Sequence, residues 1–144
     1  MNDAANQLRL TDDDSVHADD FVYRRVKDGG NINVVRNKDG IRIASSAAFE
    51  DDADGISVFL ESTLTMAHME PAAVIAGFDG YVLARVQVGS IRDMGIGIVR
   101  DPNPPDAKPM PCNVAHCLLK LPAVSKGAKH RLGQRLASQA KLIG

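Results

Sequence analysis

The chain contains no tryptophan, and aromatic residues make up only 4% of its 144 residues. Its core must therefore be built from aliphatic and alanine side chains, and recognition of single-stranded nucleic acid by base stacking is disfavoured. No apolar run approaches the roughly 20 residues that cross a bilayer. The N-terminal sequence MNDAANQLRLTDDD is acidic, whereas a signal peptide is basic and then apolar. These absences predict a cytoplasmic protein of bacterial type with no membrane partner.

Cysteine is scarce, and Cys112 and Cys117 alone cannot define a disulfide framework. His116 lies beside Cys117, which raises the possibility of zinc, but zinc needs a fourth ligand or a water. Adjacent residues on a strand also point to opposite faces, so His116 and Cys117 cannot both reach one ion. Gly95-Ile96-Gly97 lacks the third glycine and the following helix of a dinucleotide fingerprint. We expect reduced structural thiols, no metal and no cofactor.

Acidic residues are missing from the end of the chain. All 18 of them lie at or before Asp106, where they accompany ten Lys and Arg and give residues 1–106 a net charge of −8. Residues 107–144 carry seven Lys and Arg and no acid, which gives +7. Such a split suits a C-terminal part that meets an anionic partner, either nucleic acid or an acidic protein surface. Alternatively, the two parts neutralise each other within one fold.

The length and the 44% hydrophobic content fit one compact domain. Residues 1–20 contain six Asp and are expected to form an acidic flexible arm, followed by a single domain over 21–144. Alternating or β-branched runs predict strands, and the Asp39-Gly40 step between two of them predicts a hairpin. The predicted strands cover 21–27, 32–37, 41–45, 55–62, 81–88, 95–101 and 114–121.

Helical patterns are few. Pro71 and Gly77 bracket a short helix over 70–76, and a single helical turn is expected over 90–95. Ser125 is a candidate cap for a C-terminal amphipathic helix whose apolar positions are Leu132, Leu136, Ala140 and Ile143. The order predicts an α+β domain with a mainly antiparallel or mixed sheet, a short middle helix, and the C-terminal helix packed on one face of the sheet.

Five prolines lie in the loop between the last two predicted strands, and they favour a rigid excursion over a binding surface. Pro104 and Pro105 are its candidate contact residues. On the strand that follows, His116 shares a face with Lys120, opposite the apolar face that carries Ala115, Cys117, Leu119 and Leu121. His116 could act as a general acid or base, or it could be a structural histidine bonded to the loop backbone.

Arg24 and Arg25 point to opposite faces of one strand, so one of them lies on the inner side. An inward arginine needs a carboxylate or a ligand phosphate to offset its desolvation. Glu61 is a candidate partner, as is the cluster Asp51-Asp52-Asp54. The pattern leaves a structural ion pair and a phosphate-binding arginine as alternatives.

Two resemblances follow from these motifs. The order of Arg25, Ser45 and an acidic strand end at Glu61 resembles the arginine, serine, glutamate order of ADP-ribosyltransferases, which implies a catalytic Arg25 and Glu61. Residues 21–121 as a whole are similar to a group of small uncharacterised bacterial proteins, a likeness that implies positions to watch and no reaction. It rests on Tyr23-Arg24-Arg25, Ser46-Ala47-Ala48-Phe49, Asp54 to Val58, Val88 to Ile96, Asp101-Pro102 and Ala115-His116.

The C-terminal helix supplies positive charge, but not on one docking face. At 100° per residue, Arg131 and Arg135 fall on one edge of the apolar stripe and the other bases on the other side, as in a solvated amphipathic helix. These other bases include Lys126, His130 and Lys141.

Three functions remain. The leading hypothesis is a small interaction or accessory module that binds another protein through the 102–113 loop and the adjoining sheet face, with Arg24 and Lys120 as further binding candidates. The alternative is an enzyme acting on a nucleotide or nucleic acid, by ADP-ribosyl transfer or phosphoester chemistry, using His116 with an arginine. The third is a weak nucleic-acid binder that uses Arg131 and Arg135.

Overall fold

The computed structural model describes residues 11–50, 55–102, 104 and 107–143. The fold is α+β, as predicted, and is built on a six-stranded sheet in the order β6-β7-β4-β1-β5-β8, in which each strand is antiparallel to its neighbours. Its strands are β1 (Phe21–Lys27), β4 (Ile56–Leu60), β5 (Tyr81–Gln87), β6 (Gly97–Arg100), β7 (His116–Lys120) and β8 (Lys141–Ile143). A separate hairpin pairs β2 (Val34–Arg36) with β3 (Arg42–Ala44) around the predicted turn at Gly40.

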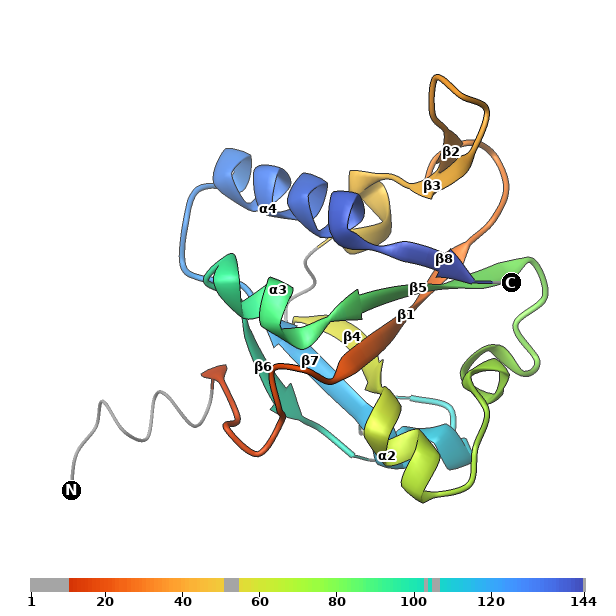
Figure 1. Cartoon of the computed structure of the whole chain (residues 1–144), viewed down its shortest axis with the longest axis vertical. Coiled ribbons are helices and arrows are strands. Elements are labelled where there is room, and N and C mark those ends of the chain that lie inside the picture. The colour runs from red at the N-terminus through yellow and green to blue at the C-terminus, as the bar shows by residue number, and fades with distance from the viewer. Residues whose placement is uncertain (1–10, 51–54, 103, 105–106, 144) are drawn as a thin grey trace.

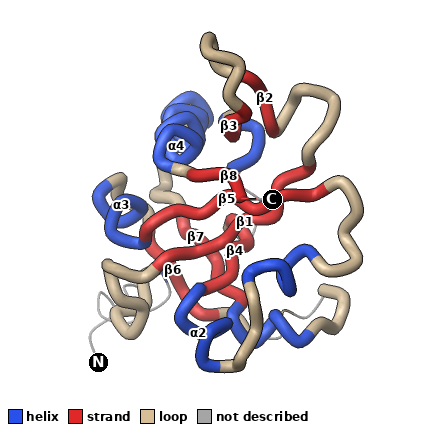
Figure 2. Tube along the Cα trace, turned by 45° about the vertical axis from the view of Figure 1, so that its right-hand side comes forward, coloured by secondary structure: helices blue, strands red, loops and turns tan. Residues whose placement is uncertain are grey.

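Helices cover both faces of the sheet (Figure 1). The α-helices are α2 (Glu61–Met66), α3 (Val88–Asp93) and α4 (Lys126–Gln139), and the 3₁₀ helices are η1 (Ser46–Phe49), η2 (Pro71–Ile75) and η3 (Pro111–Ala115). Figure 2 shows α4 and α2 on opposite sides of the strands. We call these two sides the α4 face and the α2 face.

Period-two alternation divides the strand residues between two cores. Val22 and Val26 of β1 point to the α4 face, where Leu132 and Leu136 of α4 join the same buried cluster. Tyr23 of the same strand points to the α2 face and joins a second cluster. That cluster also contains Phe59, Leu64, Val74, Leu83, Cys112 and Ala115. The sheet is therefore an apolar layer packed on both sides, which explains its aliphatic composition.

Helix α4 confirms the predicted C-terminal helix, but its end differs from the prediction. The side chain of Ser125 accepts a hydrogen bond from the Ala128 amide at 3.1 Å, so it caps the helix as expected. The helix ends at Gln139, and Ile143 lies instead in β8, which pairs with β5. Helical spacing alone cannot distinguish a last helical turn from a short strand at the sheet edge.

Other boundaries also moved. The strand predicted over 55–62 ends at Leu60, because Glu61 begins α2, and the strand predicted over 114–121 begins only at His116, after η3. The predicted 70–76 helix is the 3₁₀ helix η2. Alternation in the sequence does not reveal where these strands give way to helical turns, because tertiary packing decides it.

Residues 11–20 lie along β6 and α3. The Asp13 amide donates to the Ile98 carbonyl at 2.7 Å, and Asp12 accepts from Arg92 at 3.1 Å. A Cβ added at Gly97 would lie 1.6 Å from the Thr11 carbonyl oxygen, so only glycine permits this approach. The expected arm over 1–20 stays a prediction, since residues 1–10 lie outside the described residues. No helix in the described ranges has the length and apolarity to cross a membrane.

Candidate functional site

His116, the first residue of β7, lies on the α2 face, opposite Cys117 and Leu119, the side that alternation predicts. That face is not open there, however, because η3 and α2 build the second core over it. The His116 side chain is only 5% exposed, and its ring packs edge-on against Phe59 with the ring centroids 5.4 Å apart. The imidazole is therefore held rigidly inside the domain.

Both imidazole nitrogens of His116 have partners. Nδ1 lies 2.9 Å from the backbone carbonyl oxygen of Asp101 and 3.3 Å from its carboxylate Oδ2. Nε2 lies 3.0 Å from the hydroxyl oxygen of Ser57. The three residues come from neighbouring strands, since Ser57 is on β4, His116 on β7, and Asp101 directly follows β6.

The partners of His116 fix where its proton lies. A backbone carbonyl can only accept, so in the neutral ring Nδ1 carries the hydrogen and donates to Asp101. Nε2 is then an acceptor, and the Ser57 hydroxyl must donate to it. The result is a directed chain in which the serine proton points at an imidazole nitrogen.

Around Ser57 the α2 face is partly exposed. Ser57 is directly opposite Leu118, and Leu118 is directly opposite Val99, so the three form a row across β4, β7 and β6. All three side chains are half-buried. Lys120, a predicted binding residue, follows two positions after Leu118 and is half-buried on the same face. The buried histidine is thus hydrogen-bonded to a residue, Ser57, that is itself partly exposed.

Arg25 shares this face, but its environment differs from the one predicted. Its guanidinium lies between the rings of Phe59 and Phe78, 4.5 and 4.2 Å from their centroids. Nε donates to the Val74 carbonyl at 2.6 Å, and Nη2 lies 3.6 Å from the sulfur of Cys112. Burial lowers the pKa of Arg25, and Cys112 partly opposes that shift. Cation–π contacts and a carbonyl take the place of the expected carboxylate.

Glu61 pairs with another arginine. As the first residue of α2, it accepts from Arg85 Nε at 2.8 Å and from Arg85 Nη2 at 3.0 Å, and the Tyr23 hydroxyl also donates to it. The hydrogen bonds from Arg85 hold the pKa of Glu61 below its usual range, and burial opposes them. Burial and the Glu61 carboxylate raise the pKa of Tyr23.

The structure brings some predicted catalytic residues together and separates others. His116 and Arg25 flank the same Phe59 ring, while Glu61 is engaged by Arg85 and Tyr23. Ser45, the serine of the resemblance to ADP-ribosyltransferases, donates its hydroxyl hydrogen to the Ile32 carbonyl in the hairpin region. Each residue of that arginine, serine, glutamate set is thus bonded to a different group.

The predicted binding residues are dispersed. Arg24 points to the α4 face and donates to the carbonyls of Ala48 at 3.0 Å and Ser57 at 2.9 Å. Pro104 is half-buried in the loop, and Pro105 lies outside the described residues. Arg131 and Arg135 are exposed on α4.

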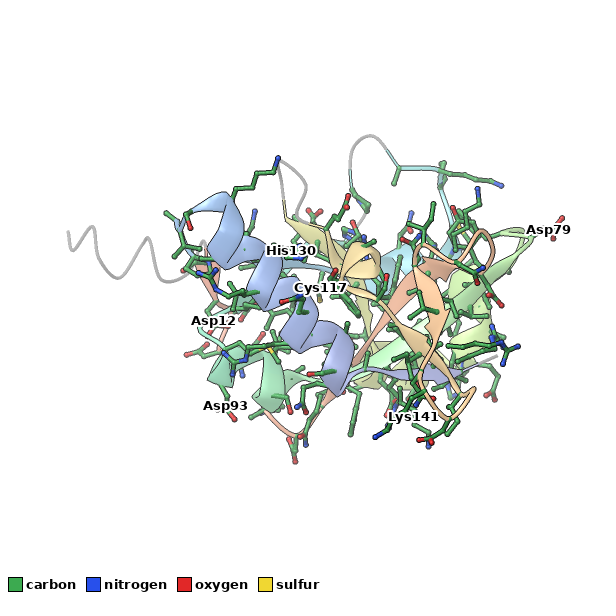
Figure 3. The ribbon with its side chains drawn as sticks, turned by 90° about the horizontal axis from the view of Figure 1, so that it is seen from above. Asp12, Asp79, Asp93, Cys117, His130 and Lys141 are labelled. Carbon is green, nitrogen blue, oxygen red and sulfur yellow. The ribbon has the colours of Figure 1, made fainter. Side chains whose placement is uncertain are left out.

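A pocket of about 420 Å³ lies between α4 and η1. Figure 3 shows His130 on α4, one of its lining residues. Lys126 and Lys129 line it together with Glu50, so the acidic and basic parts of the chain meet at this junction. In the described part of the chain, no group of three or more His, Cys, Asp and Glu residues could hold a metal ion.

Sequence reasoning missed Ser57 and Asp101 as partners of His116. Alternation already puts Ser57 on the face opposite Ile56 and Val58, and Asp101 closes the strand before the proline loop. The missing information was the strand order, because β4, β6 and β7 are neighbours in the sheet but not all consecutive in the chain.

The chain was compared with protein-family models, curated proteins and solved structures, and none of them matches it.

Proposed function

We propose that the protein is a small interaction module that binds another protein through the 102–113 loop and the surface beside it. The observation that supports this most is the exposure of two apolar side chains on elements that pack together. Met66, the last residue of α2, is 83% exposed, and Val114 of η3 is 47% exposed. Exposed apolar side chains that lie on neighbouring elements are typical of a contact site.

The underside of this surface is anchored. Arg25 reaches the sulfurs of Met110 and Cys112, and the Asn113 side chain donates to the Lys108 carbonyl at 3.0 Å. The end of the loop, from Lys108 to Asn113, is therefore ordered in the absence of a partner. A preordered surface loses less conformational entropy on association, which favours binding.

The proposed surface differs in one respect from the sequence-based hypothesis. The sheet beside the loop is covered by η3 and α2, as the burial of Ala115 and His116 shows. The contact surface therefore consists of the outer sides of these two helices and the loop, here called the α2–η3 surface. Lys108 is exposed within it, and the acid-free sequence after Asp106 favours a partner with an acidic rim around an apolar centre.

Site-specific cross-linking tests the proposal. A photoreactive phenylalanine analogue placed at Val114 or Met66 is expected to give the same discrete adduct in the native host. Val124 is the matched control, because it is 42% exposed but follows the opposite end of β7 from η3. Val114→Asp should abolish the adduct formed from position 66, whereas Val124→Asp should not. Equal adducts from positions 114 and 124, or none from either, would contradict the proposal.

A further inference from the structure

The chain of Ser57, His116 and Asp101 has a chemistry that the binding surface does not use. A serine hydroxyl bonded to an imidazole, with the other imidazole nitrogen held by an aspartate, is the arrangement that activates serine as a nucleophile. Here the two links measure 3.0 Å to Ser57 and 2.9 Å to the Asp101 carbonyl, with the Asp101 carboxylate at 3.3 Å. Such arrangements are recognised by geometry, and they occur on unrelated folds.

The direction of the hydrogen bonds matches this chemistry. Because Asp101 offers only acceptors at Nδ1, Nε2 is free of hydrogen in the neutral ring and accepts from Ser57. The polarity is the one that a general base needs. A reversed tautomer would leave His116 donating to the serine, and it would then withdraw electron density from the hydroxyl oxygen.

The base and the nucleophile differ in solvent exposure. His116 is 5% exposed and fixed against Phe59, so it cannot rotate away from the serine. Ser57 is half-buried and reaches the surface. Substrate would reach the hydroxyl from this partly exposed side, while the imidazole behind it stays oriented.

We propose that Ser57 is the nucleophile of an ester-hydrolysing site, with His116 as its general base and Asp101 as the residue that positions His116. The half-buried row of Leu118 and Val99 beside Ser57 suits a small apolar acyl group. Lys120 lies on the same face, two positions after Leu118. This activity is independent of the α2–η3 surface.

The reaction balances as two transfers. The Ser57 oxygen attacks the ester carbonyl carbon and its proton passes to Nε2 of His116; the ester C–O bond then breaks, and the alcohol leaves with that proton. The acyl group now rests on Ser57. A water molecule gives a proton to Nε2 and attacks the same carbon, and the carboxylic acid leaves as the proton returns to Ser57.

A fluorophosphonate probe tests the nucleophile in the intact protein. The Ser57 oxygen attacks phosphorus, fluoride leaves, and the serine proton passes to His116, so a stable phosphonyl ester forms. We expect one adduct, which peptide mass spectrometry maps to Ser57. Ser57→Ala should abolish it, and Ser138→Ala should not, because Ser138 lies on α4 and is bonded to the Arg135 carbonyl. An unlabelled wild-type protein, or an adduct mapped elsewhere, would overturn the proposal without reference to any variant.

The positioning residue needs its own readout. Asp101→Asn is expected to slow labelling and p-nitrophenyl acetate hydrolysis about 10-fold or more, because it removes the carboxylate that stabilises the imidazolium formed when the serine proton reaches Nε2, while the backbone carbonyl still holds Nδ1. Circular dichroism and the thermal midpoint of each variant are measured alongside, and the labelling rate is compared only among folded proteins. A folded Asp101→Asn variant that reacts as fast as wild type would refute the role proposed for Asp101. Cross-linking from Val114 should be unchanged in Ser57→Ala, so failure of one proposal is distinguishable from failure of the other.

Discussion

The central strands β1 and β5 carry three partly buried arginines, and the main interactions of the guanidinium group differ from one to the next. Arg25 lies between two phenylalanine rings, Arg85 makes a two-point ion pair with Glu61 and packs 3.5 Å from the Phe21 ring centroid, and Arg24 donates to backbone carbonyls. The planar guanidinium permits stacking and forked donation together, which lysine cannot match. A sequence prediction that assigns every inward arginine a carboxylate therefore overlooks the stacked arrangement of Arg25. The other predicted acidic partners, Asp51-Asp52-Asp54, lie outside the described residues.

The Glu61–Arg85 pair predicts a pH-dependent contribution to stability. Because Arg85 lowers the pKa of Glu61 in the folded state, the ionised pair stabilises the fold above the unfolded pKa of about 4.3. This stabilisation disappears as the pH falls through the folded pKa. Glu61→Gln should lower the free energy of unfolding by about 1 kcal/mol at pH 7, and the difference from wild type should shrink below about pH 4.

Urea denaturation at pH 7 and pH 3 measures this effect. Glu70→Gln is the matched control, since Glu70 is exposed immediately before η2. It should change the unfolding midpoint little at either pH. A Glu61→Gln deficit that is equally large at pH 3 and pH 7 would show that the ion pair is not its source.

At the scale of the elements, two glycines lie where backbone segments pack closely together. Helix α4 packs against η1 at Gly133, where an added Cβ would lie 3.4 Å from two carbonyl oxygens. The N-terminal segment approaches β6 still more closely at Gly97. A Cβ at 3.4 Å is in ordinary van der Waals contact, so only the Gly97 approach depends on the absence of a side chain. Neither contact can be read from hydrophobic periodicity.

Gly97→Ala should detach residues 11–13 from β6. The added methyl would overlap the Thr11 carbonyl, so the segment must move and lose the hydrogen bond from Asp13 to Ile98. Hydrogen exchange of the Asp13 and Ile98 amides is expected to quicken at least tenfold, while strand β1 keeps its protection. Gly127→Ala, in the exposed first turn of α4, should leave both amides unchanged. Unaltered exchange in Gly97→Ala would contradict this packing.

The elements were partly predictable from the sequence. The alternation of Tyr23 with Val22, and of His116 with Cys117, assigned the faces correctly, because side-chain direction follows strand geometry. It was wrong for Ala115, which was predicted to share the face of Cys117 but lies in η3 and joins the cluster on the α2 face. The chain of Ser57, His116 and Asp101 was not predictable, since it depends on which strands pair across the sheet. The turn into η3 and the strand β8 were missed because tertiary contacts, not local propensity, select them.

At the scale of the whole molecule, one sheet joins two separate cores. Cys112 lies in the cluster on the α2 face and Cys117 in the cluster on the α4 face, and both thiols are essentially inaccessible. Burial raises the pKa of the Cys117 thiol to about 12. Each cysteine therefore reports on the opening of one face.

The rate of thiol modification tests whether the two cores unfold together. In a single cooperative domain, both cysteines should react with 5,5′-dithiobis-(2-nitrobenzoic acid) only through global unfolding, and thus at one common rate. The Cys112→Ala and Cys117→Ala variants isolate each site, and rates are corrected for the stability of each variant. Different rates after that correction would show that one face opens without the other.

The strand order also has a consequence for synthesis on the ribosome. Strand β1 emerges first among the six, yet its two neighbours in the sheet are β4 and β5, which end at residues 60 and 87. The nascent chain must therefore carry an unpaired strand through much of translation, and the face that α4 covers stays open until about residue 139 has left the exit tunnel. Pairing between strands that are distant in the sequence slows folding and leaves aggregation-prone intermediates exposed. Newly made chains should therefore depend on chaperones more than their small size suggests.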